Sequence, residues 1–306
     1  MYTEAELRLL GALDGDATVS ELADDLNHSV NYVSELVNRA DAKGLIHTHK
    51  SGKSKRVQRS DAKAVELFDT FVQQYSHIPF PELLGGSALC VLYHLNAPRS
   101  TTDLATLVGV HRSTVHRSLS PLQERGIVYK SDGEYVINDE FEGLVTLARE
   151  FAHLRNRTRV EEHVDSYTIL WESLEEFLVQ TDDMIESDSF VTTGPERFQL
   201  FDLPLLARQR RYYLYSESKS DISAAELCCH MLVIDDGPRT RSYCLLLLKS
   251  EAVDRDEVLS LAETYGIKSV VSDLFVYLDT EGVERPDRMP TWREFRALAD
   301  EYEVTV

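Results

Sequence analysis

The chain has few of the features that mark secreted, membrane-spanning or disulfide-stabilised proteins. Its 306 residues include four cysteines at irregular spacing (Cys90, Cys228, Cys229 and Cys244), which is typical of reduced, buried thiols and not of a disulfide framework. The longest apolar runs, residues 88–93 and 243–248, are far shorter than the roughly 20 residues that cross a bilayer. Because the first residues also lack the basic and apolar layout of a signal peptide, we expect a cytoplasmic protein without a membrane partner.

Lysine is scarce, and acidic residues dominate the charge. The sequence holds 9 Lys and 23 Arg against 52 acidic residues, a net charge of −20. An acid-rich, lysine-poor surface is typical of a cytoplasm with molar salt, where repulsion is screened, and it suggests an extreme halophile. Residues 1–160 carry a net charge of −3 and residues 161–306 one of −17. The near-neutral N-terminal half indicates that its partner is an anion.

Motifs of catalysis are missing. The sequence has no glycine-rich phosphate loop and no H-E-x-x-H motif. One cluster could bind a metal or act as a redox sensor: Cys228, Cys229, His230 and Cys244. On a strand, neighbouring residues face opposite ways, so only Cys228 and His230 could share a site. We interpret the cysteines as buried thiols, and we expect no enzyme activity, no cofactor and no metal site.

An internal repeat organises the first half of the chain. Shifting the sequence by 82 residues aligns two stretches without a gap. The aligned pairs include Leu7 with Leu89, Leu10 with Leu92, Leu13 with Leu95 and Gly44 with Gly126. Both copies must therefore have the same order of structural elements.

Each copy predicts three helices followed by a β-hairpin. Apolar residues at helical spacing indicate the first helix. A hydroxyl residue followed by an acid indicates the N-cap of the second helix, at Thr18 or Ser20 and at Ser100 or Thr101. A glycine after a cationic residue ends the third helix. The pairs Ser-Gly at 51–52 and Asp-Gly at 132–133 predict the hairpin tips.

This order of elements is that of a winged helix-turn-helix domain. Residues 1–60 and 84–138 resemble the DNA-binding domains of MarR-type and ArsR-type regulators. The segments that carry this resemblance are ELADDL…YVSELVNRADAKGLI and DLATLVGVHRSTVHRSLSPLQERGIV. The whole chain resembles archaeal regulators with two such domains and a further C-terminal domain. The resemblance implies double-stranded DNA as a partner, with the third helix of each domain in the major groove. Winged helices that dock proteins are the alternative.

In the second copy, the third helix has one apolar face and one face that can form hydrogen bonds. Val115, Leu119 and Leu122 fall on one side at about 100° per residue and must face the core. Arg117 lies at the centre of the opposite face, where it can make a bidentate contact with guanine. The other candidate DNA contacts of this copy are Arg112 (to a phosphate), Ser113, Thr114, His116, Ser120 and, in the hairpin, Lys130. The alternative is a solvated helix face without a partner.

In the first copy, Glu35 takes the position of Arg117, which predicts a different division of roles. The candidate contacts on its third helix are Asn31, Tyr32, Ser34 and Asn38. Residues 47–59 contain five Lys or Arg residues and no acid. We expect this hairpin to bind the DNA backbone or the minor groove through Lys50, Lys53, Lys55 and Arg56. A disordered, solvated loop is the alternative.

Two further helical segments flank the second copy. Residues 61–83 predict a linker helix, and residues 139–165 predict a connecting helix. The connecting helix has a short apolar seam, which suits either a partner helix in a homodimer or its own domain. The seam consists of Leu144, Leu147, Phe151 and Leu154.

Residues 166–306 predict a mixed α/β domain for ligand sensing or assembly. Candidate strands are 166–172, 190–193, 211–216, 228–235 and 241–250, and candidate helices are 255–266 and 291–302. Their order is similar to that of the C-terminal domains of AbiEi-type antitoxin regulators, which descend from nucleotidyltransferases. This resemblance implies a partner protein or nucleotide chemistry.

The sequence thus predicts an α+β protein with two tandem winged helix-turn-helix domains followed by a mixed α/β domain. The expected function is that of a transcription regulator, a homodimer on double-stranded DNA, whose C-terminal domain responds to a small-molecule ligand or a partner protein. An antitoxin-type regulator and a nucleotidyltransferase-derived enzyme are the alternatives.

Overall fold

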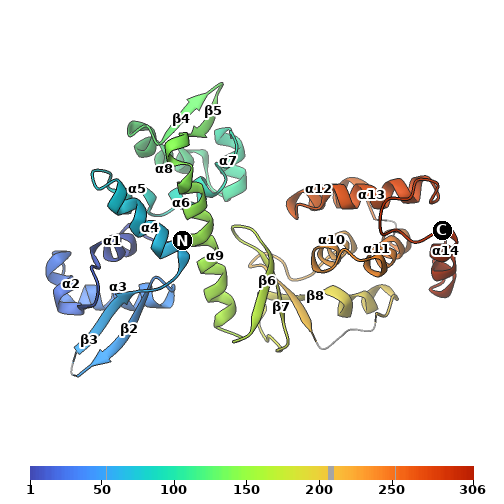
Figure 1. Cartoon of the computed structure of the whole chain (residues 1–306), viewed down its shortest axis with the longest axis horizontal. Coiled ribbons are helices and arrows are strands. Elements are labelled where there is room, and N and C mark those ends of the chain that lie inside the picture. The colour runs from blue at the N-terminus through green and yellow to red at the C-terminus, as the bar shows by residue number, and fades with distance from the viewer. Residues whose placement is uncertain (53, 206–209, 252) are drawn as a thin grey trace. The chain divides into compact units, whose positions relative to one another are not determined.

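The computed structural model describes residues 1–52, 54–205, 210–251 and 253–306. It is an α+β protein in which helices outweigh strands, and the sheets of the described residues are antiparallel. The chain folds into two compact units, unit 1 (Met1–Glu162) and unit 2 (His163–Val306). Figure 1 shows the elements of each. Within the described ranges, every helix is too short or too polar to cross a membrane.

The first repeat of unit 1 has the element order predicted from the sequence. Its elements are α1 (Glu4–Ala12), β1 (Ala17–Thr18), α2 (Val19–Asp25), α3 (Val30–Ala42), β2 (Ile46–Ser51) and β3 (Ser54–Arg59). Strand β3 pairs with both β1 and β2, so the hairpin is extended to a three-stranded sheet. The three helices bury Leu10, Leu22 and Val37 completely or nearly so, and these side chains hold the helices together.

The second repeat has the same order. Its elements are α6 (Ala88–Tyr93), α7 (Thr101–Val108), α8 (Arg112–Glu124), β4 (Val128–Ser131) and β5 (Glu134–Ile137). A single bridge between Arg99 and Tyr135 replaces the pairing of β1 with β3. Because Arg99 lies 82 residues after Ala17, the first residue of β1, the offset of the sequence repeat is kept in three dimensions.

Local signals set the ends of the helices in both repeats. Thr18 and Ser100 accept hydrogen bonds from the backbone three residues later, and each forms a capping box with the acid at that position. The turn before the third helix has a left-handed residue in each repeat, Asn27 with φ 53° and Gly109 with φ 69°. Asparagine and glycine tolerate this conformation best, which explains why the two turns fold alike.

The connecting helices complete unit 1. They are α4 (Lys63–Gln74), α5 (Phe80–Leu84), the short 3₁₀ helix η1 (Asp139–Phe141) and α9 (Gly143–Glu161). Helix α9 packs against α4 and α6, and the seam of Leu144, Leu147, Phe151 and Leu154 is buried there. Of the two interpretations of the seam, packing within its own domain is confirmed. The homodimer stays a prediction, and this seam no longer supports it.

Unit 2 has one four-stranded antiparallel sheet and a layer of helices. The strands are β6 (Tyr167–Glu172), β7 (Phe177–Thr181), β8 (Phe190–Thr193) and β9 (Arg211–Tyr215), in the order β6-β7-β9-β8. The helices are η2 (Gly194–Phe201), α10 (Ala224–Ile234), α11 (Pro238–Ser250), α12 (Arg255–Thr264), α13 (Lys268–Asp279) and α14 (Trp292–Glu301). The helices α10 to α14 share one apolar core.

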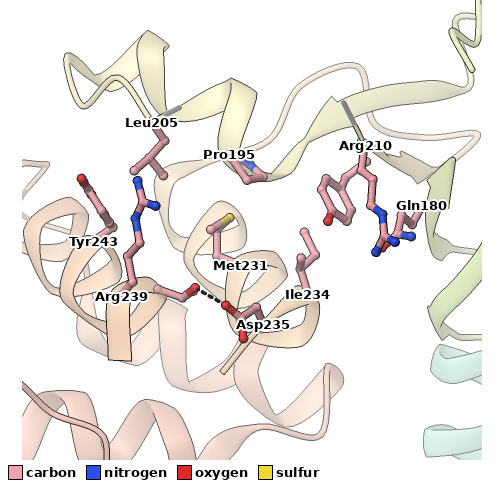
Figure 2. A pocket seen from close by; sticks show the side chains of 11 residues that line it. Gln180, Pro195, Leu205, Arg210, Met231, Ile234, Asp235, Arg239 and Tyr243 are labelled. Atoms are coloured by element: carbon pink, nitrogen blue, oxygen red, sulfur yellow. Dashed lines mark hydrogen bonds between the residues drawn. The ribbon is translucent and has the colours of Figure 1, made fainter. Parts of the chain in front are cut away.

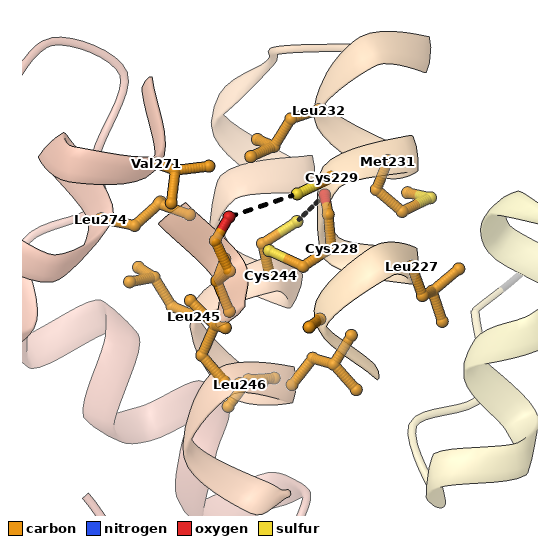
Figure 3. Close-up of a cluster of buried hydrophobic side chains, with 14 of the residues drawn as sticks. Leu227, Cys228, Cys229, Met231, Leu232, Cys244, Leu245, Leu246, Val271 and Leu274 are labelled. Carbon is orange, nitrogen blue, oxygen red and sulfur yellow. Dashed lines mark hydrogen bonds between the residues drawn. The ribbon is translucent and has the colours of Figure 1, made fainter. Parts of the chain in front are cut away.

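Two predicted strands of unit 2 are helices. Residues 228–235 and 241–250 lie for the most part in α10 and α11, which pack against each other. Periodicity cannot separate a buried strand from a helix that is apolar on every side, and α10 buries eight consecutive residues from Ala225 to Leu232. Figure 3 shows Cys228, Cys229 and Cys244 within this core. The predicted burial of the cysteines is confirmed.

Candidate nucleic-acid interface

Helix α8 presents two different faces, as its sequence predicts. Its N-cap is His111, whose Nδ1 accepts a hydrogen bond from the Ser113 backbone N–H at 3.3 Å. Val115, Leu119 and Leu122 are fully buried. The face opposite these three side chains is open to solvent, and Arg117 is exposed on it. The core thus fixes the rotation of the helix and leaves its polar face free for a partner.

The exposed surface of α8 carries side chains that can donate hydrogen bonds. Arg112 and Arg117 are exposed, and neither guanidinium forms an ion pair or hydrogen bond with the described residues. Ser113 Oγ is 2.9 Å from His111 Nδ1, and Ser120 Oγ donates to the His116 carbonyl at 2.8 Å. These two hydroxyls keep acceptor capacity toward solvent, while Thr114 is half-buried. The polar face therefore carries Arg117, which is unpaired among the described residues, beside hydroxyl groups, while Arg112 lies at the first position of the helix.

Tyr135 connects α8 to its hairpin. This side chain is only 1% exposed, and its hydroxyl lies 3.0 Å from His116 Nδ1. Lys130 Nζ lies 4.6 Å from the centre of the Tyr135 ring, a cation–π contact. His116 and Lys130, which the sequence proposed separately as DNA contacts, are thus brought to one residue. The sequence reasoning missed Tyr135, whose only signal was its place on the inward side of β5.

Helix α3 of the first repeat exposes a less cationic face. Asn31, Tyr32, Glu35 and Asn38 are exposed, whereas Ser34 is half-buried. The Tyr32 ring lies 4.7 Å from the ring of His28, centre to centre. Glu35 occupies the position equivalent to Arg117, so a carboxylate replaces the guanidinium at the centre of the face. A base contact there requires a donor such as the cytosine amino group.

In the first repeat, β2 and β3 pair from Ile46 with Arg59 to Ser51 with Ser54, so the described residues of this hairpin form strands and not an irregular loop. Lys55 Nζ donates to Asn38 Oδ1 at 2.7 Å, which joins the hairpin to α3. Arg56 donates to the Asp16 carbonyl at 3.1 Å and lies 3.5 Å from the Asp16 carboxylate. Arg56 is therefore held by its own domain, while Lys50 is exposed. Lys53 lies outside the described residues.

Unit 2 contains a buried polar chain that the sequence did not reveal. His230 is fully buried, with Nδ1 2.8 Å from Thr193 Oγ1 and Nε2 2.7 Å from the Tyr265 hydroxyl. Tyr265 donates to Glu226 Oε1 at 2.9 Å. Because the Tyr265 proton goes to the carboxylate, its oxygen accepts from Nε2–H, and Nδ1 accepts from Thr193. Burial, with minor contributions from Lys219 and Arg197, lowers the pKa of His230 to about 3 and keeps the ring neutral.

The cysteines next to His230 do not share this chain. Cys229 Sγ donates to the Val258 carbonyl at 3.9 Å, and Cys244 Sγ to the Cys228 carbonyl at 3.7 Å. Burial raises the pKa of the Cys229 thiol, which disfavours the reactive thiolate. Residues 228–230 form a helix, so the strand geometry that would place Cys228 and His230 on one face is not present. No group of three or more metal-ligating side chains gathers among the described residues.

Two family models match parts of the chain. Residues 187–304 match the family described as HVO_2833_C, C-terminal, and residues 87–140 match the HVO_A0261 N-terminal domain. The first match lies within unit 2, and the second covers the second repeat from α6 to η1. Both families are haloarchaeal, which agrees with the acid-rich, lysine-poor composition. No curated protein shows a significant match to the chain.

Proposed function

We propose that the protein is a DNA-binding transcription regulator whose two repeats act as winged helix-turn-helix units. The observation that carries this proposal is that Arg117, on the polar face of α8, and Arg112, at the first position of the helix, have no partner among the described residues although the chain has 52 acidic residues. An idle face in such a protein would be filled with carboxylates. Exposed guanidinium groups beside hydroxyls suit phosphates and guanine edges.

The two repeats contribute differently to the proposed complex. Helix α8 reads bases in the major groove through Arg117, while Ser113, Ser120 and Arg112 contact bases or phosphates. The first repeat binds mainly through Lys50 and Lys55 of its hairpin, because Glu35 repels phosphate from the centre of α3. In molar salt the Debye length falls to about 3 Å, so such close contacts matter more than the net charge.

Mapping of the DNA bound by the full chain in its native cells tests the proposal. We expect discrete bound sites that share a sequence motif, and we expect the same sites to shift the purified chain in molar potassium chloride. Arg296→Gln, at an exposed position of α14, serves as the control for Arg117→Gln. The absence of enriched sites, together with specific capture of another protein by unit 1, would identify the repeats as docking modules.

A further inference from the structure

Unit 2 contains a cavity with a volume of about 400 Å³, which lies between the sheet, η2, the end of α10 and the start of α11 (Figure 2). Cavities of this size are typical of small-molecule sites. The cavity lies inside the region matched by the C-terminal family, apart from Gln180 of β7.

The charge of this cavity is opposite to that of its surroundings. Unit 2 contains 14 Lys and Arg residues against 29 acids, yet the charged residues that line the cavity in the described part of the chain are two arginines, Arg210 and Arg239, and one carboxylate, Asp235. Neither guanidinium forms an ion pair with the described carboxylates. Arg239 lies over the Tyr243 ring, with its Cζ 5.7 Å from the ring centre, a contact that leaves its N–H groups available.

Asp235 already has a role in the fold. Its carboxylate accepts a hydrogen bond from Thr240 Oγ1 at 3.1 Å at the start of α11, where the helix dipole favours a negative charge. Gly237, the N-cap of α11, leaves room for it, since a Cβ there would lie 3.1 Å from both carboxylate oxygens. Asp235 therefore excludes a further negative charge from its part of the cavity, and the two arginines are left for a ligand.

The shape of the cavity separates the two cations. Figure 2 shows Arg239 and Arg210 at opposite ends, with Pro195, Met231 and Ile234 between them and Asp235 along one side. A molecule with an anionic group at each end and an apolar body satisfies both guanidinium groups and covers the apolar middle.

We infer that this cavity binds a small organic dianion whose negative groups stand at its two ends, such as an α,ω-dicarboxylate. Each carboxylate is bound by one arginine, and the apolar body lies on Met231 and Ile234. The regulatory consequence rests on the proposed function: occupancy of unit 2 changes the affinity of unit 1 for DNA. The binding step does not depend on DNA and can be measured alone.

Calorimetric titration of the full chain with glutarate, adipate and suberate at one potassium chloride concentration tests the inference. We expect saturable binding of at least one of them, and weaker binding of hexanoate, hexane-1,6-diol and the trianion tricarballylate. Arg210→Gln and Arg239→Gln should each weaken binding about 10- to 100-fold, because each removes hydrogen bonds to a charged group. Arg296→Gln on α14 is the matched control and should bind like the unchanged protein.

Three results would overturn the inference: no binding of any dicarboxylate at millimolar concentration, equal binding of the diol, or unchanged affinity in both arginine variants. Mobility shifts with and without the dicarboxylate then test regulation. If the dicarboxylate binds and DNA does not, the proposed function fails and the cavity assignment stands. If DNA binds and no dicarboxylate does, the cavity assignment alone fails.

Discussion

Several cationic side chains of unit 1 are unpaired, whereas others in unit 2 are bound by carboxylates of the fold. In unit 1, Arg112, Arg117 and Lys50 are exposed and form no ion pair with the described residues. In unit 2, Lys219 Nζ lies 2.6 Å from Glu226 and 3.1 Å from Glu176, and Arg241 is bound by Asp236. A cation that neutralises a half-buried carboxylate stabilises the fold, whereas an exposed, unpaired one is available to an external anion. This difference supports the proposal that unit 1 is the part that binds nucleic acid.

The two repeats within unit 1 show the same contrast on a smaller scale. Glu35 and Arg117 occupy equivalent positions on α3 and α8, so the same scaffold carries opposite charges at the same place. In the hairpins the charges are the other way round. Residues 47–59 of the first repeat contain no acid, whereas the second hairpin carries Asp132 and Glu134 beside Lys130. The two repeats thus share the same buried core and differ in the charges that their helices and hairpins expose.

The largest expected effect comes from separating the units. A fragment of residues 1–162 should bind DNA like the full chain, and a fragment of residues 163–306 should not bind it at all. The reason is electrostatic, because unit 2 would have to desolvate carboxylates beside phosphates. Mobility shifts of both fragments in molar potassium chloride measure this. A shift produced by residues 163–306 would refute the assignment of DNA binding to unit 1.

The second effect concerns the pH dependence of stability. The pKa of His230 is about 3 in the fold against 6.5 for an ordinary histidine, so below pH 6.5 the unfolded chain takes up a proton that the folded chain does not. Stability from this group is therefore complete above about pH 6.5 and falls as the pH drops toward 3, by up to about 5 kcal/mol. Denaturant unfolding of unit 2 at several pH values measures the slope, which His230→Gln should reduce.

His94 provides the control in unit 1. Burial, with Arg99 and Arg149, lowers the pKa of His94 to about 4. The stability that depends on this group therefore also falls as the pH drops. His94→Gln should reduce the slope of the unit 1 transition and leave that of unit 2 unchanged. An equal slope in unit 2 before and after His230→Gln would show that His230 does not cause its acid sensitivity.

A third effect tests the central residue of α8. Arg117→Ala should weaken binding to the specific DNA site by about 1–3 kcal/mol and relax the preference at one base pair. Glu35→Gln is the matched change on α3 and should not weaken binding, because it removes a repulsive charge. Titrations on specific and random duplexes distinguish the roles. Equal losses on both duplexes would mean that Arg117 contacts only phosphate.

A fourth effect concerns the first hairpin. Lys50→Gln together with Lys55→Gln should lower the affinity for all duplexes alike and reduce the slope of log K against log salt by about 1.8, because two phosphate contacts are lost. Titrations at several salt concentrations give this slope. An unchanged slope would remove the hairpin from the interface.

The smallest expected effect tests the connection between α8 and its hairpin. Tyr135→Phe keeps the buried ring and removes the hydroxyl that contacts His116, so unit 1 should lose about 0.5–1.5 kcal/mol of stability. Chemical denaturation measures the loss. The first repeat, whose corresponding link is Lys55 with Asn38, should be unaffected in hydrogen exchange, and equal loss of protection in both repeats would show that they unfold as one.

Short-range signals in the sequence were sufficient for both repeats. Capping residues such as Thr18 and Ser100, the left-handed turn positions Asn27 and Gly109, and the period of α8 act within a few residues of the chain. Each selects a local conformation by hydrogen bonding or steric freedom, independently of the rest of the fold. The helix ends, the turn positions and the solvent face that carries Arg117 were therefore predictable.

Long-range packing decided what the sequence left open. The runs 228–235 and 241–250 consist largely of apolar residues that suit a buried strand as well as a helix, and their packing against each other and the other helices is seen only in α10 and α11 of the folded chain. The seam of α9 suits any apolar surface, and α4 and α6 cover it. The contact of His116 with Tyr135 and the arginines of the unit 2 cavity join residues far apart in the chain. Such pairs produce no repeating pattern in the sequence, because the residues interact only when the tertiary structure brings them together.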